Sequence, residues 1–150
     1  MPQSLAYNYS HIIFSTKYRQ PLIDESIEDE LFRYIGEICN KIDFKPVKIG
    51  GNIDHIHILC ILSRKVALMK FIEEVKSHSS KWIKTKGKMY QNFYWQRGYG
   101  SISVNPHDIG IVEQYIANQA KHHKKLTFKE EYLDFLKKYN IDYDERYLWD

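Results

Sequence analysis

Two histidines separated by one residue, His55 and His57, lie in the apolar stretch His55–Leu62 (HIHILCIL). Side chains two positions apart in a β-strand point to the same face, so both imidazoles would stand side by side while Ile56 packs into the opposite face. Two adjacent imidazoles can chelate one divalent cation. An isolated pair is more often a surface or core pair satisfied by hydrogen bonds, so a metal site needs further ligands.

The segment Tyr115–Gln119 (YIANQ) carries side chains that would complete such a site. Tyr115 and Gln119 are four residues apart and therefore share one face of a helix. With two histidines, the Gln119 amide oxygen would form a neutral ligand set that leaves the charge of the ion for a bound phosphate. A nearby cation would lower the pKa of a phenol, which makes Tyr115 a candidate nucleophile. A packing tyrosine and an exposed glutamine remain the alternatives on spacing alone.

Basic residues are concentrated between residues 63 and 100, although the net charge of the chain is only +3. This segment carries nine Lys and Arg against two acidic residues. A positive field confined to part of the surface fits a polyanionic partner such as a nucleic acid, whereas a solvated helix face is the alternative. The basic residues that we expect to bind DNA are Arg64, Lys76, Lys81, Lys84, Arg97 and Lys121.

The composition limits the class of protein. The chain has 150 residues, of which 43% are apolar, and this suits one compact domain with a real core. No run approaches the roughly 18 apolar residues of a membrane span, and the N-terminus lacks a signal pattern, so we expect a cytoplasmic protein without membrane contact. Cys39 and Cys60 lack metal-binding or redox spacing, which predicts buried free thiols.

Alternating apolar residues and turn signals predict four strands, at residues 9–17, 46–49, 55–62 and 99–104. Gly50-Gly51-Asn52 predicts a tight turn between the second strand and the third. Helical periodicity predicts helices over 27–42, 68–83, 106–121 and 128–139.

Local signals support the last two helices. Asn105 followed by Pro106 is typical of a helix start, and the helix that follows should bury Val112, Ile116 and Ala120. Thr127 and Glu130 form a capping-box pattern.

The resulting order, β-α-β-β-α-β-α-α, predicts an α+β fold. We expect an antiparallel sheet of the split βαβ type, RRM-like or ferredoxin-like, with helices on one face and a C-terminal tyrosine-bearing helix. Residues 1–150 should form a single domain, in which residues 126–150 add a helical extension.

Four motifs in order give this chain a resemblance to a known family. Asp54–Leu59 (DHIHIL) is similar to the His-hydrophobic-His (HUH) strand of the single-tyrosine transposases of small bacterial insertion sequences, and Tyr115–Gln119 resembles their tyrosine helix. Lys76-x-x-Ser79-Ser80 and Trp95-x-Arg97-Gly98-Tyr99 resemble the intervening pattern. The resemblance covers about residues 9–125 and departs at Ala117, where relatives often carry a charged residue.

The resemblance implies a specific chemistry. Members of the family bind Mg²⁺ or Mn²⁺, here through His55, His57 and Gln119, and use the tyrosine, here Tyr115, to form a 5′-phosphotyrosine intermediate. They cut and rejoin single-stranded DNA with hairpin ends, act as homodimers and use no small-molecule cofactor. Their tyrosine helix can serve the site of the partner subunit.

Three other functions remain open on the sequence. A nucleic-acid-binding module without catalysis would use the same sheet to stack bases. A metallohydrolase would activate water and form no covalent adduct. A domesticated relative, resembling the tyrosine transposases associated with repetitive extragenic palindromes, would keep the chemistry and change the biological role.

Overall fold

The computed structural model describes residues 2–122 and 126–150, with the side chains of Lys121 and His122 left out of the description. Four strands form one antiparallel sheet in the order β2-β3-β1-β4. Their bounds are β1 Tyr9–Ser15, β2 Lys45–Asn52, β3 His55–Ile61 and β4 Gly100–Val104. The α-helices are α1 Glu28–Lys41, α2 Leu68–Lys84, α3 Ile109–Ala117, α4 Gln119–His122, α5 Phe128–Lys138 and α6 Glu145–Leu148.

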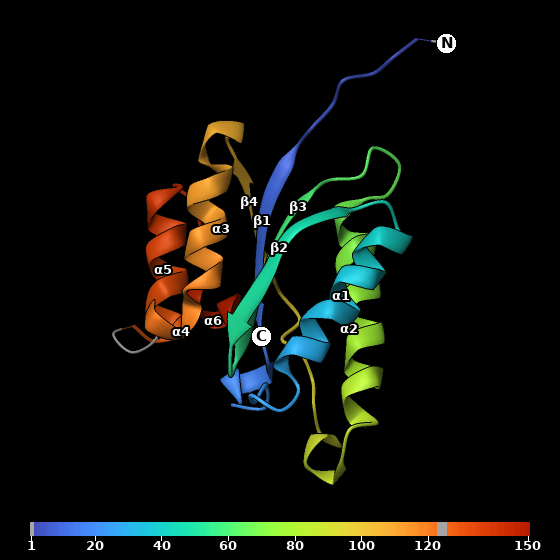
Figure 1. Ribbon diagram of the computed structural model, residues 1–150. Coiled ribbons are helices and arrows are strands. Elements are labelled where there is room, and N and C mark those ends of the chain that lie inside the picture. The colour runs from blue at the N-terminus through green and yellow to red at the C-terminus, as the bar shows by residue number, and fades with distance from the viewer. Residues whose placement is uncertain (1, 123–125) are drawn as a thin grey trace.

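Helices cover both faces of the sheet (Figure 1). The helices α1 and α2 pack on one face, as the split βαβ arrangement predicts, and α3 and α5 lie on the other. The α+β fold class is therefore confirmed, and so is the predicted order of elements as far as β4, after which α3, α4, α5 and α6 follow where two helices were predicted. The tyrosine-bearing helix is part of the second layer.

The main core fills the space between the sheet and the α1–α2 layer. Alternate residues of the central strands, including Ile12, Phe14, Ile56 and Ile58, point into it and are fully buried. Cys39 and Cys60 are buried free thiols, as predicted. Because neighbouring side chains alternate across the sheet, burial of these isoleucines turns the histidines of β3 to the opposite face.

Three local predictions are wrong. The predicted turn at residues 50–52 is part of β2, since Gly50 and Gly51 pair with His57 and Ile56 of β3. The helix that follows Pro106 does not run unbroken to residue 121, because Asn118, with φ −101° and ψ 22°, separates α3 from α4. After this break Ala120 is exposed rather than buried.

Other local predictions are confirmed. The side chain of Asn105 accepts a hydrogen bond from the His107 backbone N–H at 2.9 Å. Thr127 and Glu130 form the predicted capping box at the start of α5. Within residues 2–122 and 126–150, no helix has the length and apolar character that crossing a bilayer requires.

Candidate active site

The two histidines of the HUH strand occupy the sheet face that α3 and α5 cover. His55 and His57 are both fully buried, and their ring centroids lie 5.1 Å apart. His55 Nδ1 lies 2.7 Å from Asp54 Oδ1, and His57 Nδ1 lies 2.7 Å from His11 Nε2. These contacts fix both rings so that the Nε2 atoms face the space under α5, which is how outer groups orient metal-binding histidines.

Close approach of α3 brings Tyr115 and Gln119 to this space. A Cβ atom at Gly50, which pairs with His57, would lie 2.8 Å from Ile116 Cγ2 and 3.0 Å from the Ile116 carbonyl oxygen. The glycine therefore lets α3 lie directly on β2. Gln119 is 1% exposed, and its Oε1 lies 2.9 Å from His55 Nε2.

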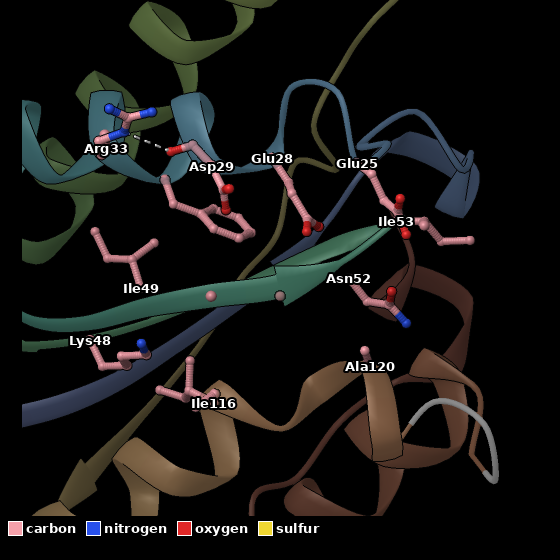
Figure 2. A pocket seen from close by; sticks show the side chains of 14 residues that line it. Glu25, Glu28, Asp29, Arg33, Lys48, Ile49, Asn52, Ile53, Ile116 and Ala120 are labelled. Carbon is pink, nitrogen blue, oxygen red and sulfur yellow. Dashed lines mark hydrogen bonds between the residues drawn. The ribbon is translucent and has the colours of Figure 1, made fainter.

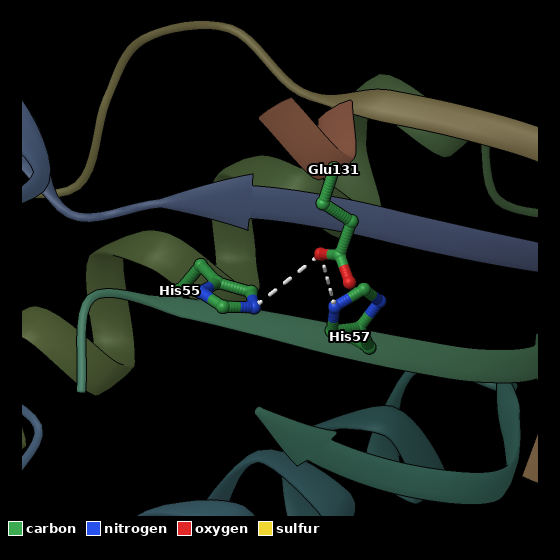
Figure 3. Close-up of side chains that lie close together, drawn as sticks. All are labelled: His55, His57 and Glu131. Carbon is green, nitrogen blue, oxygen red and sulfur yellow. Dashed lines mark ion pairs between the residues drawn. The ribbon is translucent and has the colours of Figure 1, made fainter. Parts of the chain in front are cut away.

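A carboxylate from α5 completes the cluster, although the sequence does not predict that this helix contributes to the site. Glu131 of α5 is 3% exposed, and its Oε1 lies 3.2 Å from His57 Nε2 and 3.6 Å from His55 Nε2 (Figure 3). Its Oε2 accepts hydrogen bonds from the Tyr115 hydroxyl and, at 3.3 Å, from Gln119 Nε2. One carboxylate thus links the imidazoles to the phenol.

The C-terminal segment holds α5 in this position. Phe128, Tyr132 and Leu136 of α5 pack with Ile13 in a second apolar cluster, which Trp149 joins. The Gly98 backbone N–H donates to the Asp150 carbonyl oxygen at 2.9 Å. The tail, whose role the sequence left undecided, therefore covers the histidines of its own chain.

Burial sets the protonation of the cluster. It lowers the pKa of His57 to about 4, against the opposing effect of Glu131, and the pKa of His11 to about 3, with further lowering by His57. Both rings are therefore neutral near pH 7, the state in which an imidazole binds a metal. Burial, together with the negative charge of Glu131, raises the pKa of Tyr115 well above its usual value.

The donor atoms fit one divalent ion. The ligand atoms of His55, His57 and Glu131 all lie within 4.8 Å of one another. Ligands about 2.1 Å from one Mg²⁺ are separated by about 3–4 Å, so small side-chain movements would suffice. His57 Nε2 is buried, and its contact with Glu131 does not have hydrogen-bond geometry. The amide and carboxylate oxygens are donors that hard cations such as Mg²⁺ and Mn²⁺ prefer, whereas the two imidazoles are donors typical of transition metals, so the donor set alone does not select one ion.

The basic residues predicted to bind DNA are not gathered around this cluster. Lys76, Lys81 and Lys84 belong to α2, on the opposite side of the sheet (Figure 1). Arg64, Lys81 and Arg97 are exposed, and Lys84 Nζ lies 4.2 Å from the Tyr94 ring centroid. Lys121 belongs to α4, but its side chain is outside the described part of the structure.

Lys76 has a different environment from the other basic residues. Its Nζ donates to the carbonyl oxygens of Gln96, Arg97 and Gly98 at 2.7, 3.1 and 2.8 Å. An ammonium group has three N–H donors, so these bonds use all of them. Lys76 therefore holds the loop before β4 in place, and its ammonium group has no N–H donor left to bind a phosphate.

A larger hollow of about 640 Å³ lies along β2, between α1 and the α3–α4 pair (Figure 2). Glu25, Glu28 and Asp29 line it together with the cations of Arg33 and Lys48. Burial raises the pKa of Glu28, and neighbouring carboxylates add to this effect. Carboxylates in the lining repel the phosphate backbone of a nucleic acid. The greater volume of this hollow therefore does not make it the candidate active site.

Sequence reasoning missed Glu131 and His11. The signal for Glu131 was its place between Phe128, Tyr132 and Phe135 on one helix face, where a carboxylate is unexpected without a partner. His11 shares a strand face with the buried Ile13, but nothing in the sequence shows that this face meets His57. The pairing of β1 with β3 supplies that information.

Comparison with known proteins finds transposases. Two curated relatives are the ISDra2 transposase TnpA of Deinococcus radiodurans, 21% identical over 73% of this chain and 81% of the relative, and the transposase for insertion sequence element IS200 of Salmonella typhimurium, 29% identical over 76% and 78%.

Two solved structures share the fold. One is a putative transposase from Deinococcus radiodurans R1, with a TM-score of 0.61 and 22% identity over 79% of this chain and 96% of that one. The other is a REP-associated tyrosine transposase bound to a REP hairpin, with a TM-score of 0.61 and 14% identity over 84% and 76%. Residues 4–119 match the family described as "Transposase IS200 like". This match reaches from before β1 to Gln119 and spans most of the chain, which therefore belongs to the IS200-like transposase family.

Proposed function

We propose that this transposase cuts and rejoins single-stranded DNA through a covalent 5′-phosphotyrosine intermediate on Tyr115. The observation that carries the proposal is the contact of the Tyr115 hydroxyl with Glu131, whose other oxygen lies 3.2 Å from His57 Nε2. A candidate nucleophile, a proton acceptor and a set of metal-binding donors are thus in contact. A nucleic-acid-binding module would not need them together.

Four side chains would hold the metal: His55, His57, Gln119 and Glu131. A bound Mg²⁺ or Mn²⁺ would polarise the phosphodiester and stabilise the charge that develops on its oxygens. Asp54 and His11 keep the two Nε2 atoms available, because each would accept a hydrogen bond from the Nδ1–H of its partner histidine when Nε2 binds a metal.

A residue of the chain itself accounts for the proton that the phenol loses. Tyr115 Oη forms a bond to phosphorus as its proton passes to Glu131 Oε2, and the bond between phosphorus and the 3′ oxygen breaks. The 3′ oxygen leaves as a hydroxyl after taking up a proton from water. In the reverse direction a 3′ hydroxyl attacks the phosphotyrosine and the phenol is restored, so strands are rejoined without ATP.

The raised pKa of Tyr115 explains why the reaction would need Glu131 as a base. A buried phenol next to a carboxylate stays protonated at neutral pH, and it reacts only when a base takes its proton as the bond to phosphorus forms. The arrangement therefore keeps the nucleophile inactive until a phosphate is bound.

We further propose that the substrate carries hairpin ends and that the protein acts as a homodimer, as the family resemblance implies. The similar fold of a transposase bound to a REP hairpin supports the first expectation. In this structure the rings of Tyr115 and His57 of the same chain lie 5.9 Å apart between centroids, which supports action of the tyrosine within its own subunit.

A covalent adduct tests the mechanism. A labelled single-stranded oligonucleotide from the DNA next to the gene is incubated with the protein and Mn²⁺, and then resolved by denaturing electrophoresis. We expect a protein–DNA species that Tyr115→Phe abolishes while hairpin binding persists. Equal cleavage by both proteins would exclude Tyr115 as nucleophile, and cleavage without any adduct would favour a hydrolase.

A further inference from the structure

A second cavity, of about 460 Å³, opens directly beside Tyr115. It lies between β4, α3 and α5, and its lining includes Tyr115 itself and His11. Its volume falls within the roughly 300–1,000 Å³ of small-ligand pockets. Whatever occupies this cavity therefore lies next to the side chain that we propose attacks phosphorus.

Aromatic rings extend from the nucleophile to the mouth of the cavity. The Phe135 ring packs edge-on against Tyr115 at 5.7 Å and against His11 at 5.5 Å. Tyr139 stacks on Phe135, with ring planes 11° apart, and its side chain is 43% exposed. The cavity thus offers planar apolar surface that begins inside the protein and ends in contact with solvent.

Polar groups mark the rim. Lys138 is exposed, with its Nζ 5.6 Å from the Tyr139 ring centroid. Asn105 and Asp108 are also exposed and bring an amide and a carboxylate. These groups match a planar heteroaromatic ligand that has hydrogen-bonding edges and a negative charge nearby. Its ring would stack on the aromatic side chains, its edges would face the amide, and its negative charge would face the cation.

We propose that this cavity is a nucleobase subsite, which receives an unpaired base from a nucleotide next to the scissile phosphate. The inference rests on the proposed function, because it is the phosphate at Tyr115 that brings the neighbouring base to the cavity. Stacking on Phe135 and Tyr139 would hold the base, and Lys138 would contact the phosphate beyond it. A paired base cannot enter, so the subsite also selects single strands.

Tyr139 is the residue to change, because it touches neither the histidines nor Glu131 in any described contact. Tyr139→Ala should weaken binding of the single-stranded oligonucleotide by roughly 5- to 100-fold, the range expected when an aromatic ring that stacks a base is removed. Tyr139→Phe keeps the ring and should bind like the unchanged protein. The matched control is Tyr143→Ala, which removes a similarly exposed tyrosine (38%) of the same C-terminal segment.

Fluorescence locates the base. A series of oligonucleotides, each with 2-aminopurine at one position, is titrated with protein in the presence of a chelator, so that no strand is cut. We expect quenching at one position beside the bond that the adduct experiment identifies, and loss of that quenching in Tyr139→Ala. An abasic nucleotide at the same position should lower the affinity of the unchanged protein but not that of Tyr139→Ala.

The two proposals fail in different ways. Equal affinity and equal quenching in Tyr139→Ala and the unchanged protein would overturn the subsite, whether or not an adduct forms. Absence of an adduct would overturn the covalent mechanism. The affinity and quenching measurements would still test whether the cavity binds a base. Equal losses in Tyr139→Ala and Tyr143→Ala would also overturn it, because they would show a general effect of the segment.

Discussion

The phenol of Tyr115 donates its hydrogen bond to the carboxylate of Glu131, a residue sixteen positions later in the chain. The family match ends at residue 119, so this acceptor comes from a segment outside it. The contact makes α5 part of the candidate active site and gives the C-terminal segment a chemical role.

Replacing the carboxylate of Glu131 by its isosteric amide should separate the contribution of this residue to proton transfer from its contribution to packing. Glu131→Gln keeps the shape of the side chain but cannot take the phenolic proton, so adduct formation should slow by about 100-fold or more. Single-turnover electrophoresis measures the rate. Asp142→Asn, the same carboxylate-to-amide change at an exposed residue of the C-terminal segment, should retain the full rate, and an equally fast Glu131→Gln protein would remove Glu131 from the mechanism.

Metal binding should stabilise the folded protein through the same cluster. A divalent ion at 100 times its Kd adds about 2.7 kcal/mol, which corresponds to a rise in Tm of about 5–10 °C for a domain of this size. Thermal unfolding in Mn²⁺ against a chelator measures the shift, and the EPR signal of free Mn²⁺ measures binding directly.

His57→Ala removes one ligand and should abolish most of this shift. The control is His78→Ala, since His78 is an exposed histidine on α2 whose Nε2 pairs with Glu74 at 2.8 Å. If both variants show the same Mn²⁺-dependent shift as the unchanged protein, the ion binds somewhere other than the HUH strand.

Local sequence patterns predicted the parts of the site that lie on single elements. The spacing of His55 and His57 fixes their common face once a strand forms, and the spacing of Tyr115 and Gln119 does the same on a helix. The capping box at Thr127 predicted where α5 begins. These features depend only on neighbours within a few residues, so a single sequence contains them.

The other parts of the site depend on long-range packing, which a single sequence does not reveal. Nothing local indicates that α5 folds back over β3, so the partner of Glu131 stayed hidden until the tertiary structure placed it. The sequence predicts a turn at Gly50, whereas in the structure this glycine lets Ile116 approach β2. The break at Asn118 likewise buried Gln119 and exposed Ala120, against the expected periodicity.

Acid should destabilise the metal-free protein through its buried histidines. Burial lowers the pKa of His57 to about 4 and that of His11 to about 3, whereas both return to about 6.5 on unfolding. The unfolded chain therefore binds more protons below pH 6.5, and stability present above that pH is lost as the pH falls toward 4. The expected loss between pH 7 and pH 5 is roughly 2 kcal/mol for each histidine.

Urea unfolding with a chelator at several pH values measures this dependence. His11→Gln removes one of the two titrating groups and should lower the slope of stability against pH by about half of the histidine contribution. The exposed His107→Gln should leave the slope unchanged. A His11→Gln protein with the slope of the unchanged protein would show that the buried ring does not resist protonation.

A methyl group at Gly50 should damage both stability and chemistry. Gly50→Ala forces Ile116 away from β2, and overpacking of this kind costs about 1–3 kcal/mol. Because Ile116 follows Tyr115 on α3, adduct formation should slow as well. Gly110→Ala is the matched control, since its new Cβ meets nothing within 4 Å and should stabilise α3 by about 0.5–1 kcal/mol.

Basic residues on α2 should contribute to DNA binding without taking part in the chemistry, because α2 lies on the opposite side of the sheet from α3, the helix that carries Tyr115 (Figure 1). Loss of one phosphate contact in Lys81→Ala should weaken binding and reduce the slope of log affinity against log salt by about 0.7 on a single strand. Lys41→Ala, an exposed change on α1, is the control. At saturating DNA both variants should form the adduct at the full rate, and a slower Lys81→Ala protein would show that this face takes part in catalysis.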